Sequence, residues 1–279
     1  MIEFTVADWA AWAPGLHERE TWQAWSKAPV VPSGDDTPAL AEVPAMQRRR
    51  IDRLGRMAVQ VAWWCSQAEA AGVPLVFASR HGDVQRSFVL LEQMTRGEPM
   101  SPTQFGLSVH NAIAALYSIV RGERGNYLAL AAGQATAEAA LVEAAGLLAD
   151  GAPEVLVVVY DASMPEAYAG FVDEPDPFHA WSWRVRADGE GTRLALGWTE
   201  DVDHVGGPGT PESAGVGEDE RASGTSPHAI AGVPTATGQP ATAGAALPAG
   251  LEVLRFLLAG EPMHVHRADG LCWRWRRHG

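Results

Sequence analysis

The clearest hydrophobic pattern in the chain lies within residues 101–164. Residues 111–121 place apolar side chains three or four positions apart, which predicts a helix closed by a glycine. The apolar run 127–132 has the length of a strand, and residues 135–149 are mostly Ala and Leu, which predicts a helix buried nearly all round. A further apolar run at 155–160 is typical of a strand covered on both faces. This order predicts an α/β fold.

The segments before this region predict further elements of the same fold. Residues 2–6 have the pattern of a short strand, and residues 44–71 carry one apolar helical face, which predicts a long helix with arginines near its start. Residues 74–79 predict a core strand. Tryptophans follow the first strand at irregular spacing, at Trp9, Trp12, Trp22 and Trp25. Such residues can form a ligand surface, but packing of a helix or loop onto the domain is favoured.

The last third of the chain changes in composition. Residues 181–185 and 193–198 alternate on either side of a Gly/Asp turn, which predicts a β-hairpin. Residues 199–250 are rich in Gly, Ala, Pro, Thr and Ser, which predicts a flexible low-complexity insertion. Residues 251–279 predict a helix and an edge strand that pack back on the domain. The main domain is therefore expected to span residues 1–198.

Composition excludes several functions. A net charge of −13 argues against nucleic-acid binding, which needs a basic surface. Two cysteines give neither a disulfide framework nor zinc spacing, and His264 and His266 lack accompanying ligands, so neither a metal nor a cofactor is expected. With no basic leader and no long apolar run, we expect a cytoplasmic protein without a membrane span.

The sequence around Gln134 carries a resemblance to a known family. It reads Ala132-Gly133-Gln134-Ala135-Thr136-Ala137, between the predicted strand and the buried helix. Further landmarks match without a gap at Asn111, Ser118-Ile119, Gly122, Gly125 and Gly151. The segment resembles the first half of a β-ketoacyl synthase, a condensing enzyme of the thiolase fold. The resemblance implies a layered α-β-α architecture, and it places Gln134 where that family has its nucleophilic cysteine.

Gln134 changes the chemistry that the resemblance implies. A condensing enzyme needs a thiolate at the start of a buried helix, and a carboxamide is no such nucleophile. In the family, Gln at this place marks chain-length factors, the inactive subunits that pair with a ketosynthase in type II polyketide synthases. It also occurs in decarboxylating loading ketosynthases, which use two histidines from a second half of the fold. Nothing after Met164 resembles that half. A polar helix start in an unrelated α/β protein is the remaining alternative.

Three further motifs resemble short, truncated chain-length factors of aryl polyene and xanthomonadin-type pigment pathways. They are Trp12-Ala13-Pro14-Gly15, Met46-Gln47-Arg48-Arg49-Arg50 and Trp273-Arg274-Trp275. The resemblance implies a non-catalytic subunit that pairs with a ketosynthase and shapes its acyl tunnel. The competing functions are a structural chaperone of a ketosynthase and a malonyl-carrier-protein decarboxylase.

The resemblance also implies roles for individual residues. The acyl tunnel would be lined by His110, Ala114, Tyr117 and Gln134. The ketosynthase would pair with the strand formed by Tyr127, Leu128, Ala129, Leu130 and Ala131. An acidic acyl carrier protein would contact Arg48, Arg49, Arg50 and Arg53, although a solvated helix face with internal salt bridges explains these arginines equally well. His81 beside Asp83 has the composition of a base and its orienting group, but a structural turn is favoured there.

Overall fold

The computed structural model describes residues 1–66, 72–201 and 246–279. Its strands form one sheet in the order β3-β2-β4-β5-β1-β6-β8-β7. Their bounds are β1 Ile2–Trp12, β2 Leu75–Ala78, β3 Tyr127–Leu130, β4 Val155–Asp161, β5 His179–Arg186, β6 Thr192–Glu200, β7 Met263–Ala268 and β8 Leu271–Arg277. β2 pairs in parallel with β3 and β4, and the remaining neighbours pair antiparallel. The sheet is therefore mixed.

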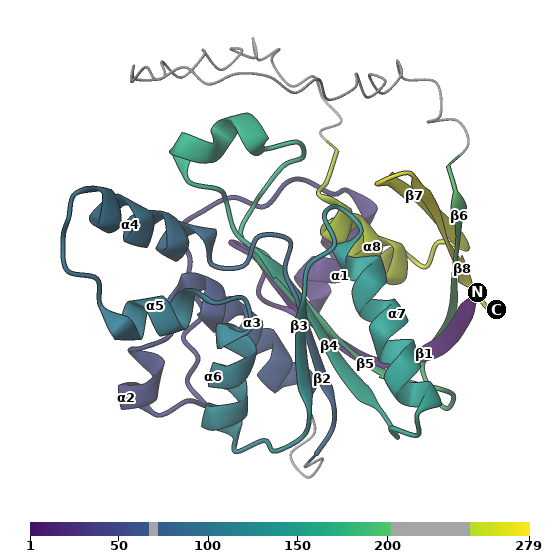
Figure 1. Ribbon diagram of the computed structural model, residues 1–279. Coiled ribbons are helices and arrows are strands. Elements are labelled where there is room, and N and C mark those ends of the chain that lie inside the picture. The colour runs from purple at the N-terminus through teal and green to yellow at the C-terminus, as the bar shows by residue number, and fades with distance from the viewer. Residues whose placement is uncertain (67–71, 202–245) are drawn as a thin grey trace, which may run out of the picture.

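Helices cover both faces of this sheet (Figure 1). Their bounds are α1 Arg19–Lys27, α2 Ala45–Arg48, α3 Arg53–Cys65, α4 Val84–Thr95, α5 Pro102–Ser108, α6 Ala112–Arg121, α7 Thr136–Ala149, α8 Ala249–Ala259 and the 3₁₀ helix η1 Glu166–Phe171. α3 and α6 pack on one face, and α1, α7 and α8 lie on the other. The layered α-β-α arrangement confirms the predicted fold class.

The central strand β4 shows why its sequence is an unbroken apolar run. Val157 and Val159 belong to the core beneath α7 and α8, whereas Val158 and Tyr160 belong to the core beneath α3 and α6. Successive side chains of a strand point to opposite faces, so burial on both faces requires apolar residues at every position.

The helix that follows β3 is less buried than its composition predicts. Thr136, Ala137 and Glu138 in its first turn are buried, but Glu143 and Gly146 lie exposed on its outer side. The prediction of burial nearly all round therefore holds for the amino-terminal half of α7 only.

The predicted long helix over residues 44–71 is wrong. The chain forms the short helix α2, leaves the helical path after Arg49, and begins again as α3. Asp52 accepts a hydrogen bond from the backbone N–H of Gly55 at 2.8 Å, and this N-cap starts a new helix. Ile51, which is 2% exposed, fills the core at the break. Residues 67–71 lie outside the described residues.

The predicted β-hairpin is also wrong, because β1 lies between β5 and β6. β1 is longer than the predicted strand and pairs with both neighbours, with Thr5 opposite Arg186 and Ile2 opposite Leu196. The connection between β5 and β6 passes so close to β1 that a Cβ atom on Gly191 would lie 2.2 Å from the carbonyl oxygen of Val6. Glycine allows this crossing.

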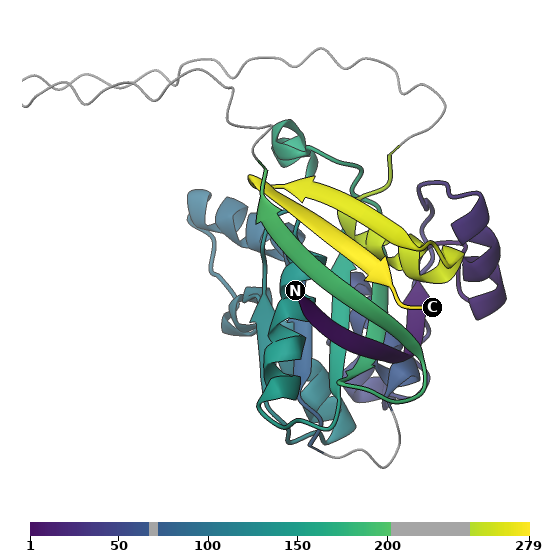
Figure 2. The same cartoon turned by 90° about the vertical axis from the view of Figure 1, so that its right-hand side faces the viewer.

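The carboxy-terminal elements join the same sheet and core. β6, β8 and β7 extend the sheet beyond β1 and curve towards α8 (Figure 2). β8 is not an edge strand as predicted, because β7 pairs with its outer side. Of the predicted insertion 199–250, the structure places the end of β6 and the start of α8, and residues 202–245 lie outside the described residues.

Candidate functional site

Gln134 lies in the turn between β3 and α7, at the carboxyl ends of the parallel strands, where ligands of α/β sheets bind. Its Nε2 donates to Oδ2 of Asp173 at 3.3 Å. The hydroxyl of Thr136 fixes the turn, since it donates to the carbonyl of Gly133 at 2.7 Å and accepts from the N–H of Ala132 at 3.0 Å. Gly133 has φ +53, and a Cβ there would meet Asp269 of the β7–β8 turn at 2.9 Å. The site is therefore closed on one side by the carboxy-terminal hairpin.

An ion-pair network fills the space beside Gln134. Arg80 donates to Asp173 at 2.6 Å and to Glu174 at 3.1 Å, and Glu174 accepts from the N–H of Ala249 at 2.9 Å. The hydrogen bond with Arg80 lowers the pKa of Asp173, whereas burial raises the pKa of Glu174. These contacts join the loop after β2 to the segment after η1 and to the start of α8. The network supports the turn and supplies no nucleophile.

Asp161 anchors the loop that follows β2. Its Oδ1 accepts from the hydroxyl of Ser79 and from the N–H of Arg80, both at 2.9 Å. Burial raises the pKa of Asp161 to about 7. Asp83 caps α4 and is bonded to Arg86 at 2.7 Å, so the carboxylate expected to orient His81 is already engaged. The alternative of a base and its orienting group at His81 and Asp83 is not supported by this geometry.

β3 forms an edge of the sheet, and no other described strand pairs with the outward half of its backbone groups. The carbonyls of Asn126 and Leu130 accept hydrogen bonds from the β2 side, at 2.9 Å from the N–H of Leu75 and 3.1 Å from that of Ser79. Alternate residues point the other way, so the N–H of Ala129 faces outward.

α6 contacts β3, α5 packs against α6 and α4 packs against α5, and these helices carry exposed apolar side chains. Exposed apolar residues on α4 to α6 and their connections are Val89, Leu91, Met94, Met100, Phe105, Val109 and Ile119. Leu128 on β3 is also exposed. We call these residues together the apolar flank. An apolar patch beside an unpaired strand edge is typical of a protein interface.

Comparison with known proteins identifies the family. The β-ketoacyl synthase N-terminal domain family matches residues 22–230. The chain belongs to this family. No curated protein sequence matches the chain.

Solved structures of ketosynthases and their partners share the fold of this β-ketoacyl synthase family member. One chain of a ketosynthase (ApeO) in complex with its chain length factor (ApeC) from Xenorhabdus doucetiae is 25% identical, with a TM-score of 0.73; the alignment covers 99% of this chain and 100% of that chain. The ishigamide ketosynthase/chain length factor gives 18% identity and a TM-score of 0.57, over 73% and 69% of the two chains. AntDE:AntF, a type II polyketide acyl-carrier protein with its ketosynthase, gives 11% and 0.54, over 71% and 70%.

Neither cysteine of this β-ketoacyl synthase family member replaces the missing nucleophile. Cys65 and Cys272 are both buried, and burial raises the pKa of the Cys65 thiol to about 12. Burial likewise lowers the pKa of His179, near the site, to about 4. The described residues contain no cluster of three or more side chains that would hold a metal ion. Nor does any helix in the described ranges have the length and apolarity needed to cross a membrane.

Two of the four predicted tunnel residues are buried in the core. Ala114 and Tyr117 are 0% and 1% exposed, and the ring of Tyr117 lies 5.7 Å from that of Phe77 in the core. His110 lies nearer to Gln134, because its Nε2 is 3.0 Å from the carbonyl oxygen of Leu130 at the end of β3. The apolar periodicity of α6 was the signal that Tyr117 is a core residue.

The predicted arginine surface divides into two parts. Arg53 donates to the carbonyls of Asp36 and Gly34 at 2.9 and 2.6 Å, and it stacks over the ring of Phe178 at 3.9 Å. Arg48 donates to the carbonyl of Leu40 at 3.1 Å. These two side chains hold the loop before α2, whereas Arg49 and Arg50 are exposed. Of these four arginines, Arg49 and Arg50 are the two without a partner among the described residues, so they can contact another protein.

The two histidines of β7 pack against helices, one of them through a buried carboxylate in α7. Glu138 is 0% exposed, and its Oε1 lies 2.8 Å from Nδ1 of His266 and accepts from the indole N–H of Trp275 at 3.3 Å. His264 stacks on Phe256 at 5.9 Å. These contacts attach the hairpin of β7 and β8 to α7 and α8. They support a structural role for His264 and His266, as expected from the sequence.

This contact predicts a pH-dependent stability. Burial lowers the pKa of His266, but the hydrogen bond and charge of Glu138 outweigh it, so the net pKa is raised. The stabilisation is therefore complete below the ordinary histidine pKa and is lost as the pH rises through the folded value. We expect the free energy of unfolding of the wild type, relative to Glu138→Gln, to fall as the pH rises from below the ordinary histidine pKa through the raised folded value. Denaturant unfolding measures it, with Glu143→Gln on the exposed side of α7 as the control; an equal pH profile in wild type and Glu138→Gln would contradict the assignment.

A cysteine at position 134 gives a second prediction. Gln134 is half-buried at the start of α7, where the helix dipole lowers a thiol pKa. In Gln134→Cys we expect the new thiol to react with iodoacetamide at least about tenfold faster than Cys65 and Cys272. We expect no condensation activity from that variant alone, because the imidazole of His110, the histidine placed nearer to this site, is held through Nε2 by the carbonyl oxygen of Leu130. Mass spectrometry locates the label, and condensation of malonyl and acyl carrier proteins by the variant would contradict this reading.

Proposed function

We propose that this chain is a non-catalytic, chain-length-factor-like subunit that pairs with a ketosynthase in type II polyketide biosynthesis of the aryl polyene type, or in a related fatty-acid-like pathway. The observation that carries the proposal is the open edge of β3 beside the apolar flank. An unpaired edge of this kind calls for a covering partner. Because Gln134 stands where the family has its nucleophile and a carboxamide cannot act as one, the partner would supply the thiolate.

The comparison structures support the same pairing. The ApeO–ApeC structure is described as a ketosynthase in complex with its chain length factor. The alignment covers 99% of this chain and 100% of the matched chain, which supports a pairing of the same kind here.

In the proposed complex the ketosynthase adds its own strand to β3 and supplies the cysteine and histidines. His110 and Gln134 lie at the end of β3 that opens towards the partner, so they are the tunnel residues we retain. Ala114 and Tyr117 act behind them as core residues. Arg49 and Arg50 provide the charge that an acidic carrier protein would contact, because Arg48 and Arg53 are engaged within the chain.

Co-expression with ketosynthases from the same genome tests the pairing. We expect co-purification and, by native mass spectrometry, a one-to-one heteromer. A well-folded solitary monomer or a homodimer would overturn the proposal.

Product length tests the tunnel residues. In an active complex, substitution of His110 or Gln134 by larger side chains should shorten the product; unchanged product length would favour the structural chaperone instead. Release of carbon dioxide from malonyl carrier protein by the chain alone would favour the decarboxylase.

A further inference from the structure

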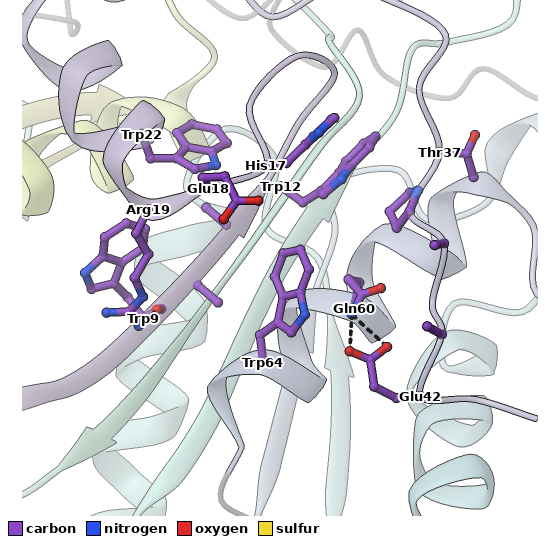
Figure 3. Close-up of a pocket in the computed structure, with 15 residues that line it drawn as sticks. Trp9, Trp12, His17, Glu18, Arg19, Trp22, Thr37, Glu42, Gln60 and Trp64 are labelled. Atoms are coloured by element: carbon purple, nitrogen blue, oxygen red, sulfur yellow. Dashed lines mark hydrogen bonds between the residues drawn. The ribbon is translucent and has the colours of Figure 1, made fainter.

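A cavity of about 570 Å³ lies on a different part of the molecule from the β3 edge. It is bounded by the second half of β1, the start of α1, the loop at residues 37–42 and the side of α3 (Figure 3). β5, β4 and β2 separate β1 from β3 in the sheet. A cavity of this volume is of the size that binds small molecules.

Indole rings form the walls of the cavity. Its tryptophans are Trp9, Trp12, Trp22 and Trp64. Trp64 stands up from α3 between Arg19 and Trp9 on one side and Gln60 and Glu42 on the other (Figure 3). Trp64 is 43% exposed, and its ring stacks on no aromatic ring of the described residues. The indole of Trp12, by contrast, stacks on the ring of His17 with 5.4 Å between the ring centroids. The indole N–H of Trp22, a side chain that is 0% exposed, has no hydrogen-bond partner in the described structure.

The cationic groups of the cavity are already paired. Arg19 is bonded to the carboxylate of Asp8 and the carbonyl of Trp9, and its guanidinium lies 4.7 Å from the ring centre of Trp9. The ring of His17 lies 3.3 Å from the carboxylate of Asp36. Both basic side chains that line the cavity, Arg19 and His17, therefore already have carboxylate partners, Asp8 and Asp36.

Two carboxylates remain without a cation. Neither Glu18 nor Glu42 forms an ion pair with any described residue. Glu42 is held in place by Gln60, whose Nε2 donates to both of its oxygens at 3.1 Å while Oε1 accepts from the N–H of Leu40 at 3.0 Å. Gln60 is 3% exposed, so this support is rigid. The cavity thus presents the exposed indole of Trp64 together with a positioned carboxylate that has no cationic partner among the described residues.

We infer that this cavity is a binding site for a small organic cation that carries an ammonium or guanidinium group. Such cations bind over indole faces, and Trp is the aromatic side chain that attracts them best. Glu42 and Glu18 supply the opposite charge, and Arg19 over Trp9 is an intramolecular example of the same contact. An anionic ligand would meet the two carboxylates and no free cation. The inference is independent of the proposed pairing with a ketosynthase.

Binding of choline and of agmatine to the full-length chain tests the inference. The neutral comparison is dimethylbutanol, which has the shape of choline without its charge. We expect at least one of the two cations to change tryptophan fluorescence saturably, with a calorimetric affinity at least about tenfold tighter than that of the neutral isostere. Equal binding of the isostere, or no saturable binding of either cation, would overturn the inference.

Variants assign the binding to this cavity. Glu42→Gln removes the charge and keeps one side-chain oxygen that can accept from Gln60, and it should weaken cation binding at least about fivefold while binding of the isostere stays the same. Trp64→Ala should have a similar or larger effect. Trp198→Ala is the matched control, because Trp198 is 41% exposed and lies on β6 outside the cavity. Unchanged cation affinity in both Glu42→Gln and Trp64→Ala would place the ligand elsewhere and contradict the inference. Co-purification with a ketosynthase should be unaffected in all three variants, so failure here is distinct from failure of the proposed function.

Discussion

Ala129→Pro is expected to abolish co-purification with the ketosynthase while the chain itself remains folded. The N–H of Ala129 points away from β2, so proline removes a donor that the isolated chain does not use. In the proposed complex the same N–H faces the partner's strand, where its loss and the bulk of the proline ring break the pairing. Pull-down from co-expressing cells measures the complex, and far-ultraviolet circular dichroism of the purified variant measures the fold.

The opposite edge of the sheet supplies the matched control. On β7 the carbonyl of Pro262 accepts from the N–H of Arg277, so the backbone of Val265, three residues on, faces away from β8. Val265→Pro should leave ketosynthase binding intact, because that edge is not the proposed interface. Equal co-purification of wild type and Ala129→Pro would show that β3 is not the contact.

Tyr117→Ala is expected to lower the free energy of unfolding by about 3–5 kcal/mol, the cost of deleting a large ring from a packed core. Tyr117 is 1% exposed, packs against Phe77 and belongs to the core beneath α3 and α6. Ile119→Ala, on the same helix but 67% exposed, should change stability by no more than about 0.5 kcal/mol.

Thermal and denaturant unfolding distinguish the two roles considered for Tyr117. A variant of normal stability that makes a longer product with the ketosynthase would restore Tyr117 to the tunnel wall. A destabilised variant with unchanged product length would support a core role for Tyr117 and would count against its place in the tunnel wall.

Local signals account for the elements that the sequence predicts correctly. The apolar run of β4 is long enough and uniform enough to require cover on both faces, and that is where the two cores meet it. Asn111 and Gly122 mark the ends of α6, and Gly122 takes the left-handed conformation with φ +71. The position of Gln134 at the start of α7 follows from the spacing of its neighbours. These features depend on residues close together in the sequence, so a single sequence records them.

Other features depend on contacts between distant segments. The turn at residues 187–191 has the residues of a hairpin, but β1 enters between its two strands because it can pair with both. The break between α2 and α3 reflects the competition between a continuous helical face and the N-cap of Asp52, and the burial of Ile51 tips it towards the break. The cavity beside β1 has no sequence signature, because Trp9, Glu42 and Trp64 belong to three separate elements.

The sequence by itself determined that this protein is an α/β member of the β-ketoacyl synthase family, and it predicted that Gln134 stands in the nucleophile's place, because both rest on local pattern and spacing. Only the tertiary structure decided which strand edge of the described sheet stays open, which of the predicted tunnel residues and arginines lie at the surface, and that tryptophans and a carboxylate from separate segments line one cavity. Those outcomes depend on how side chains compete for burial and partners once the sheet has assembled. That competition is settled by packing across the whole domain.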